Sequence, residues 1–278
     1  MLHERDFEDH RTKRDVSLSW LTVATPSNLP PPCPLTIQTL SLAPRHRFPE
    51  HSCRWHQVVC ALEGTLTVNT STRSFVVSPG QAAWLPAGLS HQIGSLLGAE
   101  LCSIWIEDVA SVDLPAAHAV LPVSPLLKAL ILEATAIEGS ADSDDYAPRV
   151  RRLILDQLRR TRTLSSPLPW PRSGLLLSLC EALYTDPADP RSFAEWSKSF
   201  GMSSQTLARR FEAEMGLSLR SWRHRLRLFR AIEMLAGGLS VTQTAADLGY
   251  GSASAFVYAF RAAQGSSPHA YMRQRSSS

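Results

Sequence analysis

The chain has 278 residues, of which 44% are hydrophobic, and its 28 Lys and Arg against 25 Asp and Glu give a formal net charge of +3. A chain of this length exceeds the usual size of one hydrophobic core, so about two domains are expected. No run approaches the roughly 20 apolar residues of a membrane helix, and the charged N-terminus is unlike a signal peptide, so we expect a cytoplasmic protein with no membrane partner. The five cysteines include no Cys-x-x-Cys pair, which argues against a disulfide framework or a zinc ribbon.

The N-terminal half begins with an arm and continues with strands. Residues 1–34 are polar and then proline-rich, which is typical of a frayed or extended arm. Residues 35–106 contain short apolar or alternating runs that are separated by Gly, Pro, Asn and Ser. Strands of this length and spacing predict a small β-barrel or sandwich.

The hydrophobic period changes to about 3.6 over residues 124–161, which predicts two amphipathic helices. The first apolar stripe comprises Leu126, Leu127, Leu130, Ile131 and Ala134. The second comprises Val150, Leu153, Ile154 and Leu158. Two such helices suit a dimer interface, although covering the barrel is an equally good explanation. Residues 162–172 contain three prolines and are expected to link two domains.

The C-terminal part is basic and contains an internal repeat. From Arg172 onward there are 13 basic and 8 acidic residues, against 15 and 17 before it, and a basic half favours a polyanionic partner. The repeated units are residues 192–219 and 241–268. In each unit a short helix ends at a glycine, a second helix begins at serine caps, and apolar anchors stand four residues apart. This pattern predicts two helix-turn-helix units.

The two predicted second helices present different chemistry to solvent. In the first unit, Gln205, Thr206, Arg209 and Arg210 remain outside when the anchors are buried, and arginine and glutamine can bond guanine and adenine in a major groove. In the second unit the outer positions are Ser252, Ser254, Ala255, Val257 and Tyr258. We expect the first unit to supply most base readout, and the second to use thymine methyl groups, phosphates and DNA shape.

A long helix is expected to join the two units, because apolar residues recur at helical spacing over residues 219–238. A helix of about 18 residues would be about 27 Å long, the right order to hold two reading helices one DNA turn apart. Its outward arginines are Arg220, Arg223, Arg227 and Arg230. We expect phosphate contacts from them, Arg223 in particular, and the alternative is a solvated charged face.

These features together resemble the DNA-binding domain of the AraC/XylS family of bacterial regulators. The resemblance covers residues 173–274 and depends most on GMSSQTLARRF, residues 201–211, and DLGYGSASAFVYAFRAAQGSSPHAYM, residues 247–272. It implies DNA-facing positions near the start of both second helices: Gln205, Thr206, Ala208 and Arg209, and Ala253, Ser254, Ala255, Val257 and Tyr258. Ser204 and Arg210 are expected to bind DNA beside them. Ala208, Val257 and Tyr258 stand where many members have longer polar groups, which weakens the expectation of base readout by the second unit.

Residues 45–92 resemble a cupin barrel, as the sensing domains of this family often do. PGQAAWLPAGLSH, residues 79–91, follows the second cupin motif, and the ligand positions of the first motif fall on His51, Cys53 and Gln57. With His91, these residues would suit Zn²⁺ or another late divalent metal. The other interpretation is a barrel without metal, whose pocket takes a small organic effector or is only packed.

The sequence thus predicts an α+β protein of two domains. A cupin-like sensing and dimerisation domain spans residues 35–161, with the barrel at about 35–106 and the helices at about 124–161, and residues 173–275 form an all-α DNA-binding domain. The expected partners are double-stranded promoter DNA, a small-molecule or metal effector and a second copy of the chain, with RNA polymerase as a further candidate. We expect a bacterial, nucleoid-associated regulator and no enzyme. The alternatives are a metal-dependent cupin enzyme tethered to DNA, and a ligand-independent DNA-binding protein with a scaffold barrel.

Overall fold

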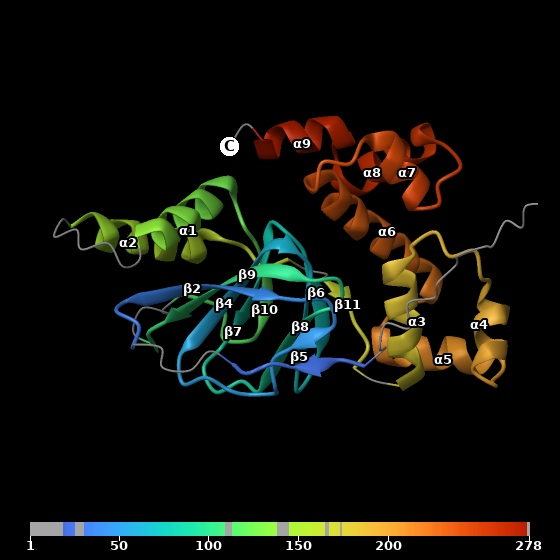
Figure 1. The fold of residues 1–278 in the computed structure, drawn as a ribbon, viewed down its shortest axis with the longest axis horizontal. Helices are drawn as coiled ribbons and strands as arrows, with labels where there is room; N and C mark the ends of the chain where they lie inside the picture. Colours follow the sequence, from blue (N-terminus) through green and yellow to red (C-terminus); the bar gives the residue numbers. More distant parts are fainter. Residues whose placement is uncertain are drawn as a thin grey trace, which may run out of the picture.

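The computed structural model describes residues 19–25, 31–108, 113–137, 145–164, 167–172 and 174–276. It has a β-rich N-terminal domain and a helical C-terminal domain, joined by α3 and the segment before it (Figure 1). The predicted α+β class with these two domains is confirmed. Within the described ranges, no helix is long and apolar enough to cross a membrane.

Two sheets form the N-terminal domain. One has the order β1-β3-β8-β5-β6-β11 and the other β10-β7-β4-β9-β2. The strands are β1 (Leu21–Thr22), β2 (Leu35–Leu42), β3 (His46–Arg47), β4 (His56–Gly64), β5 (Leu66–Thr70), β6 (Ser74–Val77), β7 (Gln81–Leu85), β8 (His91–Ser95), β9 (Ala99–Ile106), β10 (Ala119–Pro122) and β11 (Leu168–Pro169). Successive side chains of β4 and β9 alternate between the space inside the barrel and the outer face of the second sheet, as a strand requires. Val59 and Leu101 lie in the inner core, whereas Val58 and Cys102 lie in the outer one.

The helices α1 (Pro125–Ile137) and α2 (Tyr146–Arg160) cover that outer face (Figure 1). The predicted stripes are wrong at two positions, because Leu126 is 56% and Leu153 is 49% exposed. Leu155 is buried in place of Leu153. The face of α2 that packs on the sheet consists of Val150, Ile154, Leu155 and Leu158, which have the spacing of one side of a helix. Leu153 lies beside this face and is exposed.

Two segments expected to be extended are partly packed. Leu21–Thr22 pairs in parallel with β3, within the predicted arm. Leu168–Pro169 pairs with β6, within the predicted linker, and the Trp170 ring is buried beside α3. Proline has no backbone N–H to donate to a sheet. It is tolerated here because β11 is an edge strand, and one side of an edge strand needs no ladder hydrogen bonds. The linker prediction therefore missed a strand that attaches this segment to the barrel.

The helical domain consists of α3 (Gly174–Thr185), α4 (Phe193–Ser199), α5 (Ser204–Met215), α6 (Leu219–Ala236), α7 (Val241–Asp247), α8 (Ala253–Gln264) and α9 (Pro268–Ser276). One core joins α3, α4, α5 and the first half of α6, and a second joins the rest of α6 to α7, α8 and α9. The long helix α6 thus belongs to both cores. It ties the two predicted helix-turn-helix units, α4–α5 and α7–α8, into one domain.

Both units use the same local devices. Serines cap α4, α5, α7 and α8, each accepting a hydrogen bond from a backbone N–H three residues later. Gly201 and Gly249, in the turns, have φ of +64° and +72°. This left-handed conformation ends one helix and starts the next, and it is accessible to glycine at little cost. The repeated turn and cap pattern predicted from the sequence is therefore present in both units.

Candidate nucleic-acid interface and effector site

The helix α5 buries one face and exposes a polar one. Leu207, Phe211 and Met215 lie in the core, whereas Gln205, Arg209 and Arg210 are exposed. The smaller predicted residues Ser204, Thr206 and Ala208 are partly buried. The Thr206 hydroxyl lies 2.9 Å from the capping Ser203 hydroxyl, and the Ser204 hydroxyl lies 2.9 Å from that of Ser197 in α4. These two hydroxyls make local contacts at the turn, so the longer side chains Gln205, Arg209 and Arg210 form the exposed polar face of α5.

The helix α8 presents a far less polar surface. Phe256 and Phe260 are buried, and Ala253 and Val257 pack partly against the same core. Tyr258 is 79% exposed and stands two residues after the first anchor, where α5 has Arg209. Ser254 and Ala255 are also exposed. Among the predicted DNA-facing positions of α8, none carries a charge.

The arginines of α6 are placed differently from the sequence prediction. Arg223 donates to the carbonyl oxygens of Asp189, at 2.7 Å, and Arg191, at 3.3 Å. Arg227 donates to the Pro187 oxygen at 3.2 Å. Arg230 donates to the Glu233 carboxylate at 2.7 Å. Three of the four arginines expected to face outward therefore have hydrogen-bond partners within the chain. Of the four, Arg220 is exposed.

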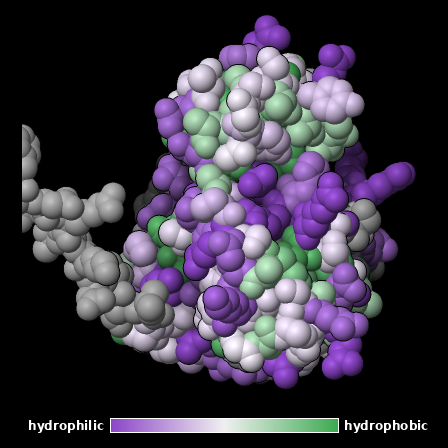
Figure 2. All heavy atoms as spheres, turned by 90° about the vertical axis from the view of Figure 1, so that its right-hand side faces the viewer, coloured by the Kyte–Doolittle hydropathy of each residue, from purple (hydrophilic) through white to green (hydrophobic). Residues whose placement is uncertain are grey.

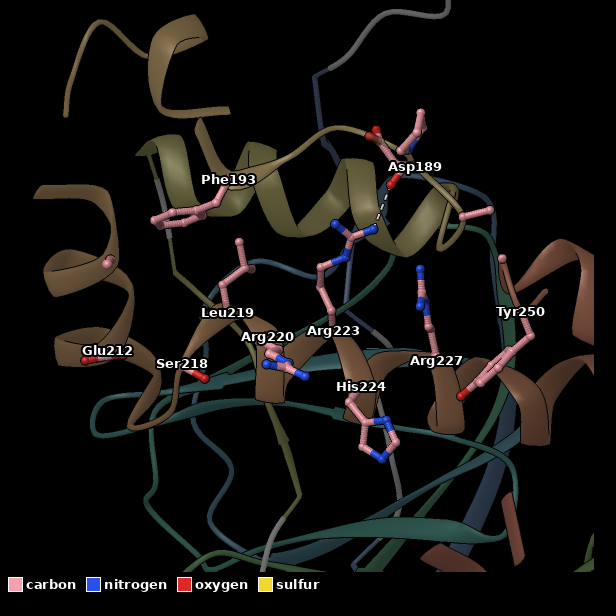
Figure 3. A pocket seen from close by; sticks show the side chains of 14 residues that line it. Asp189, Phe193, Glu212, Ser218, Leu219, Arg220, Arg223, His224, Arg227 and Tyr250 are labelled. Carbon is pink, nitrogen blue, oxygen red and sulfur yellow. Dashed lines mark hydrogen bonds between the residues drawn. The ribbon is translucent and has the colours of Figure 1, made fainter. Parts of the chain in front are cut away.

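The segment of residues 186–191, between α3 and α4, causes this difference. Its carbonyl groups turn toward α6, where the Asp189 oxygen accepts the bond from Arg223 (Figure 3). The Pro187 oxygen accepts the bond from Arg227. On its far side, the Ala188 Cα lies 3.0 Å from where a Cβ on Gly249 would stand. Gly249 belongs to the turn of the second unit, so this segment contacts both units. A side chain at residue 249 would force the two apart, in addition to straining the backbone.

A hollow of about 820 Å³ lies between the two units. Figure 2 shows hydrophilic side chains gathered between the upper lobe, which holds α7–α9, and the lower lobe. The walls of this hollow are the side of α5 that carries Ala208 and Glu212, the first half of α6, the 186–191 segment and the turn before α8 (Figure 3). Arg220, Arg223, His224 and Arg227 line it, against the acidic Asp189 and Glu212. The surface between the two units is thus concave, and basic side chains outnumber acidic ones there.

The predicted effector or metal residues lie at one end of the barrel. The inner side chains of β4 and β9 at this end are Gln57, Ser103 and Trp105, and Gln57 stands directly opposite Trp105. Leu85, which pairs with Gln57, is joined to His91 by the short connection of residues 86–90, so β8 begins at the same end. His51 lies against His91, with ring centroids 4.5 Å apart. We call His51, Cys53, Gln57, His91, Ser103 and Trp105 the polar end of the barrel.

These residues do not fit a cupin metal centre. In the described part of the chain, no three His, Cys, Asp or Glu side chains are arranged to hold a metal ion. His51 and Cys53 also lie outside the regular strands, between β3 and β4. The chain therefore keeps the residue spacing of the cupin motif, but the metal-donor atoms at those positions do not meet at one point.

A charged contact connects the two domains. Glu181, on α3, accepts hydrogen bonds from the Trp20 indole at 2.7 Å and from the Arg45 guanidinium at 2.9 Å. The Arg45 and Glu181 side chains are only 17% and 11% exposed. Deeper in α3, Tyr184 donates to Glu233 of α6 at 2.9 Å. Burial raises the pKa of Glu233, although Arg230 beside it acts in the opposite direction.

Comparison with known proteins matches both domains. A family model described as a helix-turn-helix domain matches residues 196–274, and one described as an AraC-like ligand binding domain matches residues 42–110. The HTH-type transcriptional regulator NimR of Escherichia coli K12 is 31% identical over 224 residues, which are 81% of this chain and 82% of NimR. The HTH-type transcriptional regulator RipA of Corynebacterium glutamicum is 31% identical over 46% of this chain and 37% of its own length. Among solved structures, ToxT of Vibrio cholerae O395 has 12% identity and a TM-score of 0.38, covering 87% of this chain and 98% of ToxT.

Proposed function

Because the chain belongs to the AraC family of helix-turn-helix transcriptional regulators, we propose that α5 and α8 enter successive major grooves of promoter DNA. The observation that carries the proposal is the pair of capped units at the two ends of α6. At 1.5 Å per residue, the 18 residues of α6 span about 27 Å, close to the roughly 34 Å of one DNA turn. The concave basic surface between the units would then face the backbone that separates the two grooves.

Within this interface we assign different tasks to the side chains. Gln205 and Arg209 are exposed, long enough to reach base edges, and able to form paired hydrogen bonds with adenine and guanine. Arg210 and Arg220 are exposed cations on the same domain and are proposed to contact phosphates. Arg223 and Arg227 are proposed to fix the spacing of the two units, since their donors already bind the 186–191 segment.

Selection of bound duplexes from a random library by the purified full chain tests the proposal. We expect an enriched sequence that binds on the order of 10³-fold more tightly than random DNA at the same salt concentration. An Arg209→Ala variant of unchanged folding provides the matched control, because it should lower that ratio. Equal affinity for selected and random DNA would contradict sequence-specific binding.

The N-terminal domain is proposed to sense a small molecule at the polar end of the barrel and to act through the Trp20–Arg45–Glu181 contact. A ligand can shift the arrangement of the domains only by binding one arrangement better than another. Glu181→Ala removes the carboxylate that accepts the hydrogen bonds of Trp20 and Arg45, and therefore breaks this mostly buried contact between the domains. We expect this variant to bind operator DNA with the same affinity with and without effector, whereas wild-type affinity depends on effector.

Dimerisation through α1 and α2 is proposed from their exposed apolar side chains. Leu126 and Leu153 are 56% and 49% exposed on helices that otherwise cover the barrel. A second copy would bury them. Light scattering of the purified chain should give the dimer mass, and Leu153→Glu should give the monomer mass. A monomeric wild-type chain at micromolar concentration would contradict this part of the proposal.

A further inference from the structure

The polar end of the barrel has a defined hydrogen-bonding character. We propose that it takes an uncharged, planar small molecule that donates hydrogen bonds, such as a carboxamide or an N–H heteroaromatic compound, and that it rejects carboxylates and phosphates. The proposal rests on the sensing function proposed above for this domain. It adds the chemical class of the ligand, argued from the atoms that face the site.

His91 supplies the first acceptor. Its Nδ1 lies 2.9 Å from the Leu89 carbonyl oxygen, and because a carbonyl can only accept, Nδ1 carries the proton. With Nδ1 as the donor to Leu89, Nε2 is the ring nitrogen that can accept a hydrogen bond. That nitrogen is buried and has no hydrogen-bond partner, in a residue only 2% exposed.

His51 repeats this arrangement at the edge of the site. Its Nδ1 lies 2.9 Å from the Pro49 carbonyl oxygen, so its Nδ1 also carries the proton. The two rings are tilted by 56° with their centroids 4.5 Å apart. Both imidazoles are thus anchored by backbone carbonyls and leave Nε2 for another group. This pairing of anchored rings presents acceptors and aromatic surface together.

Gln57 adds a second polar group with an unused atom. The residue is 3% exposed, and its amide nitrogen donates to the Ser103 hydroxyl at 3.1 Å. Its Oε1 is buried with no hydrogen-bond partner. A buried amide oxygen without a donor is unfavourable, and such groups in native proteins are usually satisfied. A ligand N–H or O–H within reach of Oε1 would satisfy Gln57, as another would satisfy Nε2 of His91.

The walls of the site favour a flat molecule. The Trp105 ring lies directly across the strand pair from Gln57, and its indole N–H has only the Cys53 thiol, a weak acceptor, beside it. Trp105 and the two imidazoles place three aromatic rings among the side chains of the polar end. An amide or heteroaromatic ring could stack there and offer an acceptor to the indole N–H while donating to His91 and Gln57.

Charge provides the discrimination against acids. None of the six side chains of the polar end carries a fixed positive charge. A carboxylate at neutral pH is an acceptor only, so it would place its charge in a buried site facing the lone pairs of His91 and Gln57. Its binding would require protonation of a buried histidine beside another histidine. A carboxamide of the same shape avoids both costs.

Benzamide and benzoate form a matched pair of probes, because they share ring and size and differ only in the amide and carboxylate groups. Saturation-transfer NMR on the full chain at neutral pH should show benzamide binding in the millimolar range and benzoate at least tenfold weaker. His91→Phe and Gln57→Leu should each weaken benzamide binding at least fivefold. Arg54→Ala, a change at an exposed residue outside the polar end, is the matched control and should leave benzamide binding unchanged.

The outcomes separate this inference from the proposed function. Benzoate binding as tight as benzamide, absence of benzamide binding, or equal benzamide binding by wild type and both polar-end variants would overturn the inference. Circular dichroism melting curves, compared with wild type, identify a variant that fails to fold, and the other variant then decides. If benzamide binds at the polar end but operator affinity never depends on any barrel ligand, the sensing function fails and the ligand class stands.

Discussion

The two helix-turn-helix units differ in the surface that they offer to DNA while sharing their scaffold. In both, a serine cap, a glycine turn and two buried anchors four residues apart fix the second helix. At equivalent positions on the outer faces, α5 has Gln205 and Arg209 where α8 has Ser254 and Tyr258. A repeated scaffold therefore constrains the anchors and turns, whereas the reading side chains are free to diverge. The following predictions test the shared half of this comparison first and then the divergent half.

The largest expected effect concerns the shared scaffold. Phe211→Ala and Phe260→Ala remove side chains that are 0% exposed in the two cores. Loss of a buried phenylalanine typically costs about 3–5 kcal/mol, so both variants should lower the free energy of unfolding by that order in urea titrations. Gln205→Ala, at an exposed position, is the control and should change it by less than about 0.5 kcal/mol. A large loss in only one unit would show that the scaffolds are not equivalent.

The next effect concerns the reading face of α5. Arg209→Ala should weaken binding to the selected operator by about 1–3 kcal/mol and relax base preference at one position, as expected for a bidentate guanine contact. Tyr258→Ala, at the equivalent position of α8, should cost less. Fluorescence anisotropy with operator and random duplexes measures both. Equal losses on the two duplexes would make Arg209 a phosphate contact instead.

A smaller effect concerns the apolar face of α8. Replacing thymine by deoxyuridine removes one methyl group, and burial of a group of this size contributes about 0.8 kcal/mol. We expect about that loss per contacted thymine in the half-site of α8, and a smaller loss in the half-site of α5. The loss should disappear in Tyr258→Ala if the ring makes the contact. Equal sensitivity of both half-sites to deoxyuridine would remove the distinction between the units.

The smallest effect separates two arginines of α6. Arg220 is exposed, so Arg220→Ala should reduce the slope of log affinity against log salt by about 0.9, the value for one phosphate contact. Arg223 already donates to two carbonyl groups, so Arg223→Ala should lower stability and leave the slope unchanged. A reduced slope for Arg223→Ala would restore its sequence-based prediction as a phosphate contact.

Local patterns explain what the sequence predicted well. Caps, turn glycines and anchors act within one helix-turn-helix unit, so the positions of α5 and α8 could be read from residue spacing alone. Alternating runs likewise indicated the barrel strands. The assignments of individual residues to DNA or effector remain predictions, since they depend on molecules outside the chain.

Contacts between distant segments explain what the sequence missed. The partners of Arg223 lie more than 30 residues away along the chain, on the 186–191 segment. The pairing of β11 and the contact of Trp20 with Glu181 likewise join parts of the chain that share no local pattern. At the polar end, motif spacing predicted candidate residues, but where their side chains lie relative to one another depends on how two sheets meet.

Methylation and deoxyuridine interference on the selected operator tests the central claim most directly, because it maps base contacts without any change to the protein. The account predicts two contacted patches on one face of the duplex, separated by about one helical turn, with guanine contacts in one patch and thymine methyl contacts in the other. A single patch, or two patches that both depend on guanine, would contradict an interface of two units with different reading faces.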